Sequence, residues 1–284
     1  MSRQELFRRM RKSYFFVIGA TLVLIIVLVA LFSHYIAPHD PIKSNLAKRL
    51  LPPQGLSGGW SGNVMGTDPL GQDILSRLMV GSRVSLQISF SVVIITAVVG
   101  TALGIVAGYF GGIVDTVIMR FSDIQVSIPP IVLAIAVMSV LGNSTFNLIM
   151  VLVFTRWVQY ARIVRSNVMM IRNTEFIHAS IVLGSSKIRL MFTQIFPNVL
   201  TSLIIVISQE FGRTILTESS LSFLGLGVPP PAPSWGVMIA DGREYLSTAP
   251  WVVIVPAVML MFTVLAFNFL GDGVRDILDP KNKN

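Results

Sequence analysis

The 284-residue chain contains no cysteine and few charged or histidine residues. Without cysteine there is neither a disulfide framework nor a thiolate metal site. Its three histidines, His34, His39 and His178, do not have the spacing of a metal-binding cluster, so we expect no metal site. Charged residues make up 13% of the chain. Soluble domains carry about 25%, so the low share points to a protein that lies in a bilayer.

The sequence also lacks the motifs of a self-contained enzyme. "LGSSK" has a glycine and a lysine, but it lacks the first glycine of the phosphate-binding pattern G-x-x-x-x-G-K-[ST] and no Ser or Thr follows the lysine. No Ser/His/Asp set is placed for nucleophilic catalysis. We therefore expect no catalytic residue and no ATPase site in this chain.

Hydrophobic residues, in contrast, make up 53% of the chain, and the mean hydropathy is +0.73. About 20 apolar residues cross the hydrocarbon core as a helix. We expect an all-α membrane protein with six transmembrane helices, at Tyr14–Ile36, 84–108, 113–141, 147–168, 197–217 and 251–270. A signal peptide is the alternative for the first run, but the run is too long for an h-region and no A-x-A-like cleavage site follows it.

The net charge of +8 predicts orientation and does not indicate nucleic-acid binding. Thirteen Lys and Arg residues lie in the N-terminus, the loop after the fourth span and the tail, against six in the outer loops. The positive-inside rule then places both termini in the cytoplasm. The predicted regions are a cytoplasmic N-terminus and first helix (1–36), an external loop (37–83), a core of five helices (84–272) and a cytoplasmic tail (273–284).

Four glycines follow one another at steps of four in the second predicted span. On a helix they form one groove without side chains, where another helix can approach closely. We interpret this groove as a helix-packing seam, formed by Gly100, Gly104, Gly108 and Gly112.

Charged residues within the fifth predicted span are candidate functional residues, because charge is costly in the membrane. Glu210 and Arg213 are three residues apart and share a helix face, and Glu218 lies two turns beyond Glu210. They are either the polar wall of a translocation pathway or internal contacts that hold the bundle together. Arg156 in the fourth span either contacts a partner or extends to the interface.

The Gly- and Pro-rich segment 223–236 is expected to form an external cap, since lipid-exposed irregular backbone is excluded.

The segment 174–198 predicts a short helix, a break at Gly184, and a second amphipathic helix that continues into the fifth span. Phe176, Ala179, Ser180 and Leu183 share one side of the short helix. Gly184 is a helix stop, and Pro197 suits the first turn of the next helix. Such a helix either docks in a groove of another protein or lies on the membrane surface.

This segment resembles the loop shared by permease subunits of ATP-binding-cassette (ABC) importers, E-A-A, three residues, G, nine residues, then I-x-L-P. Ala179, Gly184 and Pro197 match, whereas the Glu, the second Ala, the Ile and the Leu of the pattern are replaced. The replacing residues are His178, Ser180, Gln194 and Phe196. The rest of the chain is similar to the dipeptide, oligopeptide and nickel branch of the family. The ordered matches include "MGTDPLGQDILSRLMVGSRVSL", "GYFGGIVDTVIMRFSDI", "YARIVRS", "SFLGLGVPPPAPSWGVMI" and "FNFLGDGVRDILDP".

The resemblance implies a type I ABC importer permease fold in a bacterial plasma (inner) membrane. It implies a second, homologous permease subunit as heterodimer partner, two ATP-binding subunits that hold ATP and Mg²⁺, and an external solute-binding protein. This chain would bind no cofactor and would translocate di- or oligopeptides by alternating access. Carried over, residues 175–186 would form the coupling helix that contacts the ATPase, with Glu175, His178 and Leu183 within it and Gly184 ending it. His178 in place of the family's Glu puts in doubt any salt bridge made by that Glu.

Three alternatives remain. Within the same family, the substrate is instead nickel or a metal–chelator complex. An ion-coupled secondary transporter is the alternative from another class, but it often shows inverted repeats with midplane carboxylates, and no convincing repeat is present. A membrane scaffold without transport activity would not need a cytoplasmic docking helix.

Overall fold

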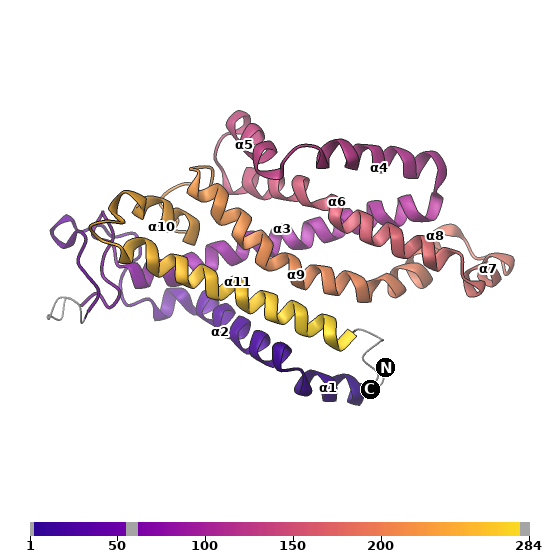
Figure 1. Ribbon diagram of the computed structural model, residues 1–284, viewed down its shortest axis with the longest axis horizontal. Coiled ribbons are helices and arrows are strands. Elements are labelled where there is room, and N and C mark those ends of the chain that lie inside the picture. The colour runs from indigo at the N-terminus through magenta and orange to yellow at the C-terminus, as the bar shows by residue number, and fades with distance from the viewer. Residues whose placement is uncertain (1–2, 55–61, 279–284) are drawn as a thin grey trace.

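The chain folds into a bundle of helices, as the computed structural model of residues 3–54 and 62–278 shows (Figure 1). Apart from one isolated bridge between Thr67 and Asp73, these residues contain no β-structure, which confirms the all-α prediction. The lysines predicted in the cytoplasmic tail, at 281 and 283, lie outside the described residues. The helices are α1 (Arg3–Lys12), α2 (Tyr14–Ile36), α3 (Ile74–Phe110), α4 (Gly112–Val126), α5 (Pro130–Leu141), α6 (Thr145–Arg172), α7 (Glu175–Val182), α8 (Lys187–Leu190), α9 (Phe196–Phe223), α10 (Trp235–Gly242) and α11 (Trp251–Leu278).

Four helical segments of the described chain are long and apolar enough to cross a membrane. They are Tyr14–Ile36, Ile74–Phe110, Lys187–Phe223 and Trp251–Leu278. A fifth crossing results if the bent pair α4 and α5 counts as one span. The predicted total of six is therefore not confirmed. The helix α6 is not among the four, and it carries Arg156, Arg162 and Arg165 along its length.

The third predicted span, 113–141, is not one helix. The helices α4 and α5 meet at an angle of 87° around Pro129 and Pro130. Proline has no backbone N–H to donate and its ring clashes with a preceding helical turn, so the pair ends α4 and starts α5. Pro130 occupies the first turn of α5, where its fixed φ is compatible with a helix.

The second span begins earlier than predicted, because α3 starts at Ile74 and not near residue 84. The Asp73 carboxylate accepts a hydrogen bond from the Ser76 backbone N–H at 2.9 Å and caps the helix. Arg77 in its first turns is buried between two carboxylates, those of Asp68 at 3.4 Å and Asp241 at 3.6 Å. The expected external loop is correspondingly shorter, because its last residues belong to the helix.

The long helices run along the long axis of the molecule, with different elements at its two ends (Figure 1). The loop before α3 and the short helix α10 lie at one end, and α7 projects at the other. Helix α1 and the C-terminal part of α11 lie toward the end that carries α7. Both ends of the described chain are therefore on the same side of the bundle as α7.

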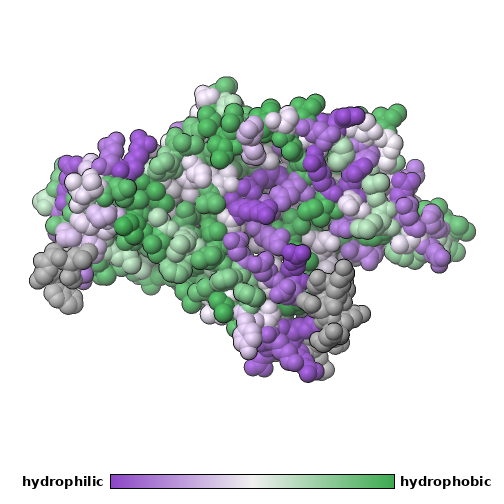
Figure 2. Space-filling model, in the orientation of Figure 1, coloured by the Kyte–Doolittle hydropathy of each residue, from purple (hydrophilic) through white to green (hydrophobic). Residues whose placement is uncertain are grey.

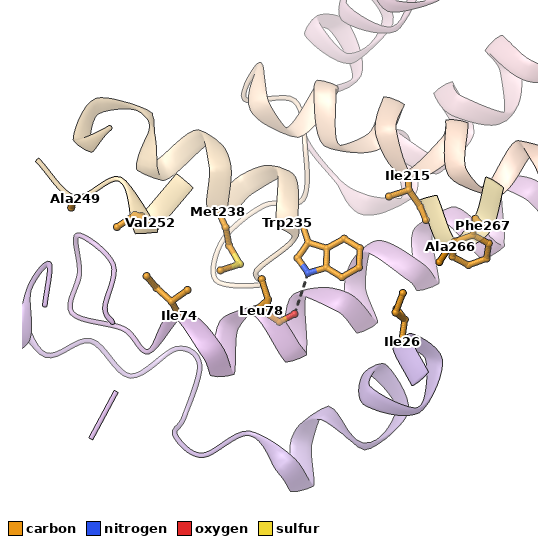
Figure 3. Close-up of a cluster of buried hydrophobic side chains, with 10 residues drawn as sticks. All are labelled: Ile26, Ile74, Leu78, Ile215, Trp235, Met238, Ala249, Val252, Ala266 and Phe267. Carbon is orange, nitrogen blue, oxygen red and sulfur yellow. Dashed lines mark hydrogen bonds between the residues drawn. The ribbon is translucent and has the colours of Figure 1, made fainter. Parts of the chain in front are cut away.

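A hydrophobic cluster holds the end of the bundle that carries α10 (Figure 3). Trp235 begins α10, is fully buried, and donates a hydrogen bond from its indole Nε1 to the Leu78 carbonyl oxygen of α3 at 3.1 Å. Ile74, Met238 and Val252, from α3, α10 and α11, belong to the same cluster. The Gly- and Pro-rich segment before Trp235 thus leads into a well-packed cap.

Candidate functional site

Helix α7 is short and anchored by one buried residue. Ile177 is fully buried in a cluster that includes Val168 of α6 and Val199 of α9. The other apolar residues near the end of the helix are not covered: Val182 is 86% exposed and Leu183 is 85% exposed. His178 is also exposed. The helix therefore combines a fixed attachment with an apolar tip that projects from the bundle (Figure 1).

A glycine terminates α7 in the conformation that the sequence predicts. Gly184 has φ +81°, in the left-handed region. Its N–H bonds to the Ile181 carbonyl at 2.9 Å, and the Ser185 N–H bonds to the Ser180 carbonyl at 3.1 Å. This is the hydrogen-bond pattern of a Schellman C-cap, which requires a positive φ at the glycine. Pro197, the last residue of the predicted loop pattern, lies in the first turn of α9.

Two departures from the importer loop pattern contact each other. The Gln194 side-chain amide donates a hydrogen bond to the Ser180 hydroxyl oxygen at 2.8 Å. Ser180 belongs to α7, and Gln194 to the single π-helical turn Met191–Ile195 that joins α8 to α9. This bond fastens α7 to the base of the spanning segment, and the sequence pattern alone did not indicate it.

The charges inside the bundle form a three-membered cluster. Glu210 is 1% exposed, and its two carboxylate oxygens accept hydrogen bonds from Arg156 at 2.7 Å and Arg213 at 3.1 Å. Arg156 also donates to the Arg213 carbonyl oxygen at 3.1 Å and to the Thr217 hydroxyl. The partner of Arg156, which the sequence left undecided, is thus Glu210 on α9.

Glu218 is separate from that cluster and fully buried. Its carboxylate accepts hydrogen bonds from the hydroxyls of Ser222 at 2.8 Å, Ser219 at 3.3 Å and Ser85 at 3.5 Å. Because Ser85 is on α3 and the other two are on α9, the carboxylate links two spanning helices. In this structure Glu218 does not reach the surface on which Arg213 lies.

The predicted glycine seam lies between α3 and α6. A Cβ added at Gly100 would approach the Tyr160 Cβ to 2.5 Å, and one at Gly104 would approach the Ala161 carbonyl oxygen to 2.7 Å. At Gly108 the Arg165 carbonyl oxygen would be 2.8 Å away. The grouping of Gly112 with these residues is wrong, because it begins α4 after the chain has turned and a Cβ there would meet nothing within 4 Å.

Ion pairs join α4 and α6, and the sequence did not predict them. Arg165 pairs with Asp115, and Arg162 pairs with Asp123 at 2.8 Å. The Gln125 side-chain oxygen accepts a hydrogen bond from the Trp157 indole Nε1 at 2.7 Å. Their separation of 32 to 50 residues gives no local signal. Only the antiparallel placement of two helices brings them together.

The fold and the apolar segments define a membrane protein with several spanning helices. A chain of the MetNI methionine ABC transporter, in an inward-facing form, has a similar structure with a TM-score of 0.57 and 20% identity. The match covers 70% of this chain and 95% of that one. An amino acid ABC transporter crystallised with histidines gives a TM-score of 0.54 at 15% identity, over 69% and 91% of the two chains. The chain therefore has the fold of these transporter chains.

Residues 100–284 match the model of the binding-protein-dependent transport system inner membrane component, and residues 3–53 match the N-terminal transmembrane domain of oligopeptide transport permease C. The chain belongs to the binding-protein-dependent transport system inner membrane component family. It is thus a membrane permease component of an ABC importer, a kind of system that also includes ATP-binding and substrate-binding partners.

Several relatives match over nearly the whole chain. The dipeptide transport system permease protein DppC of Haemophilus influenzae is 40% identical over 94% of this chain and 90% of its own length. The di/tripeptide permease protein DppC of Pseudomonas aeruginosa is 41% identical over 94% and 88%. The glutathione transport system permease protein GsiD of Pectobacterium atrosepticum is 36% identical over 99% and 92%.

Proposed function

We propose that the chain is a permease subunit of an ATP-driven importer that moves di- or oligopeptides across the bacterial inner membrane. The observation that carries this proposal is the similarity to relatives named for dipeptide, di/tripeptide and glutathione transport, which extends over 94% or more of the chain. These three substrates are all short peptides with free carboxylates, so short peptides are the substrate class that they share.

The transport unit would be a heterodimer of this chain with a second, homologous permease subunit. Two ATP-binding subunits would lie on the cytoplasmic side and hold ATP and Mg²⁺, and a solute-binding protein would deliver peptide from outside. This chain would bind no cofactor. Its six spans would comprise α2, α3, the bent pair α4 and α5, α6, α9 and α11, with both termini in the cytoplasm.

Helix α7 would be the docking element for an ATP-binding subunit. Its apolar tip, Val182 and Leu183, is 85% or more exposed, whereas the opposite side is held by buried Ile177. A projecting apolar helix end suits a groove on a partner protein, in the helix-in-groove mode. Because α7 follows α6 after two residues and is bonded to the base of α9, a movement of the docked ATPase would reach both helices.

Reconstitution tests this function. The chain is purified with its second permease and ATP-binding subunits and placed in proteoliposomes with the solute-binding protein. We expect saturable uptake of a labelled dipeptide that requires both ATP and the binding protein. Uptake driven by a proton or sodium gradient without the ATP-binding subunits would contradict the proposal. So would uptake of a nickel complex in the absence of any peptide uptake.

A further inference from the structure

Over the described residues, the ion-pair cluster that contains Arg213 carries an excess positive charge on a membrane-spanning segment. Two guanidinium groups, of Arg156 and Arg213, share the single carboxylate of Glu210, which leaves one net positive charge on the cluster. The Arg156 side chain is 17% exposed, and its N–H groups are used by Glu210, the Arg213 carbonyl and Thr217. The Arg213 side chain is 62% exposed and has one contact with Glu210, at 3.1 Å. The excess charge and the unused donors therefore both lie on Arg213.

This charge lies within the spanning segment Lys187–Phe223. Arg213 is ten residues from the end of α9 at Phe223, which at 1.5 Å per residue is about 15 Å along the helix axis. Charged side chains within a span almost always face the bundle interior or a water-filled cavity, so we expect the side of α9 that carries Arg213 to face water or protein. Three flanking positions on the same side are polar and half-buried, Gln209, Thr217 and Ser220, whereas Leu216 beside them is apolar and 52% exposed. Figure 2 shows hydrophilic residues gathered in the middle of the face that it draws, between hydrophobic areas.

We propose that Arg213 binds the C-terminal carboxylate of the peptide while the peptide crosses the membrane. This inference rests on the proposed function and deepens it, because it assigns a substrate group to one residue. A guanidinium offers two parallel N–H donors to a carboxylate, and the bond is strengthened where water is scarce. The ligand class is thus a free α-carboxylate.

Glu210 positions this site and moderates its affinity. Its carboxylate holds Arg213 on one side, and Arg156 fixes the carboxylate in place at 2.7 Å. A bound peptide carboxylate therefore competes with Glu210 for the same guanidinium. Transport needs binding that is strong enough to admit the substrate and weak enough to release it, and this competition supplies the release.

The first test compares a free-acid dipeptide with its C-terminal amide in the reconstituted complex. Each variant's uptake is divided by that of the wild type for the same peptide, which cancels the preference of the binding protein. We expect Arg213→Gln to lower uptake of the free acid about ten- to a hundredfold, the usual effect of losing a charged hydrogen bond, and to leave the amide unchanged. Arg162→Gln is the matched control. Arg162 is an exposed arginine on the side of α6 that faces α4, where it pairs with Asp123, and its substitution should change uptake of neither the free acid nor the amide.

The second test uses the absence of cysteine in the chain and does not depend on amide uptake. An Arg213→Cys complex is assembled first and then treated with a methanethiosulfonate that adds either an aminoethyl or a sulfonatoethyl group. We expect the positive group to restore free-acid uptake and the negative group not to restore it, with the treated wild type as control. If neither Arg213→Gln nor Arg213→Cys assembles into a complex, Arg213→Lys is used for the test. We expect this variant to raise the KM for the free-acid peptide and to leave the KM for the amide unchanged.

The outcomes separate this inference from the proposed function. Equal losses for acid and amide in Arg213→Gln, or restoration by both reagents, would overturn the inference and indicate a structural contact, such as pairing with an acidic residue of the second permease. Unchanged free-acid uptake would overturn it as well. Absence of any peptide uptake by the wild-type complex would overturn the proposed function, and the inference with it.

Discussion

Ser180 and Gln194 are two residues at which the loop departs from the family pattern, and their side chains contact each other. The Gln194 amide donates to the Ser180 hydroxyl at 2.8 Å across the junction between α7 and the spanning segment. The Gln194 side-chain oxygen Oε1 has no hydrogen-bond partner among the described residues, so the bond that the amide donates to Ser180 is the side chain's attachment. The pair therefore places a hydrogen bond between two positions at which the family pattern has the apolar residues Ala and Ile.

We expect Ser180→Ala to destabilise the protein by about 1 kcal/mol, because it leaves the half-buried Gln194 amide without its acceptor. The double variant Ser180→Ala, Gln194→Ile restores the family residues at both positions and should recover most of this loss. The measurement is a double-mutant cycle of denaturant unfolding in detergent, with a coupling energy of about 0.5–1 kcal/mol.

Thr193→Val is the control, since that exposed hydroxyl bonds only to the Arg189 carbonyl of its own helix turn, and it should have little effect. Additive effects of the Ser180 and Gln194 substitutions would show that the two side chains do not support each other.

Other residue-level features had no signal in the sequence. Arg156 and Glu210 are 54 positions apart, and Arg165 and Asp115 are 50 apart. Because charge is costly in a span, the sequence identified Glu210 and Arg213 as candidates. Which arginine forms an ion pair with Glu210, however, depends on how α6 and α9 cross. Pairing of this kind is set by tertiary structure and not by local spacing.

At the scale of elements, the end of α7 depends on the backbone of one residue. Gly184 has φ +81°, and a Cβ there would meet nothing within 4 Å. A larger side chain therefore has room, and its cost lies in the left-handed conformation, which is unfavourable for a β-branched residue. A substitution at Gly184 therefore changes the backbone conformation at the end of α7 without adding a steric clash.

We expect Gly184→Val to reach the membrane and assemble, but to lose most peptide uptake while the complex still hydrolyses ATP. The backbone strain is about 1–3 kcal/mol, enough to shift the C-cap and with it the exposed tip. Gly184→Asn is the matched control, because asparagine tolerates positive φ, and it should transport nearly as well as the wild type. The comparison is the number of peptides taken up per ATP hydrolysed. Wild-type coupling in Gly184→Val would count against α7 as the docking element.

Elements with uninterrupted apolar runs were the most predictable. The first span was predicted at Tyr14–Ile36 and α2 has these bounds, and the last predicted span starts at Trp251 like α11. The start of α3 was missed because the charge-free run that predicted the span is bounded by Arg83. Arg77, inside the helix, is paired with Asp68 of the preceding loop and with Asp241 of α10, which is far away in the sequence. The break between α4 and α5 had a local signal in Pro129 and Pro130, but the apolar residues on both sides outweighed it.

At the scale of the whole molecule, the arrangement of the ends leads to a topology prediction. Helix α1 and the end of α11 lie toward α7, and the loop between α10 and α11 lies at the opposite end (Figure 1). In the proposed six-span arrangement, the first group would be cytoplasmic and the second external. Single cysteines are a direct probe here, because the native chain has none.

We expect a membrane-impermeant thiol reagent to label Leu246→Cys on intact spheroplasts, since this side chain is 54% exposed beyond α10. Lys12→Cys and Val182→Cys should react only after the membrane is opened. The cysteine-free wild-type chain is the control for background. Labelling of position 12 or 182 from outside would contradict the six-span arrangement with cytoplasmic termini.

Because α3 fits closely against α6 at Gly100, Gly104 and Gly108, we expect the two helices to move as one rigid body. Helix α3 has 37 residues and so extends about 55 Å, from the Tyr109 end near α7 to the Asp73 cap near α10. A body of that length that tilts by about 5° moves its far end by about 5 Å. A small rotation of α6 at the α7 end would therefore be amplified, by leverage alone, into a displacement at the opposite end large enough to admit or exclude a peptide backbone.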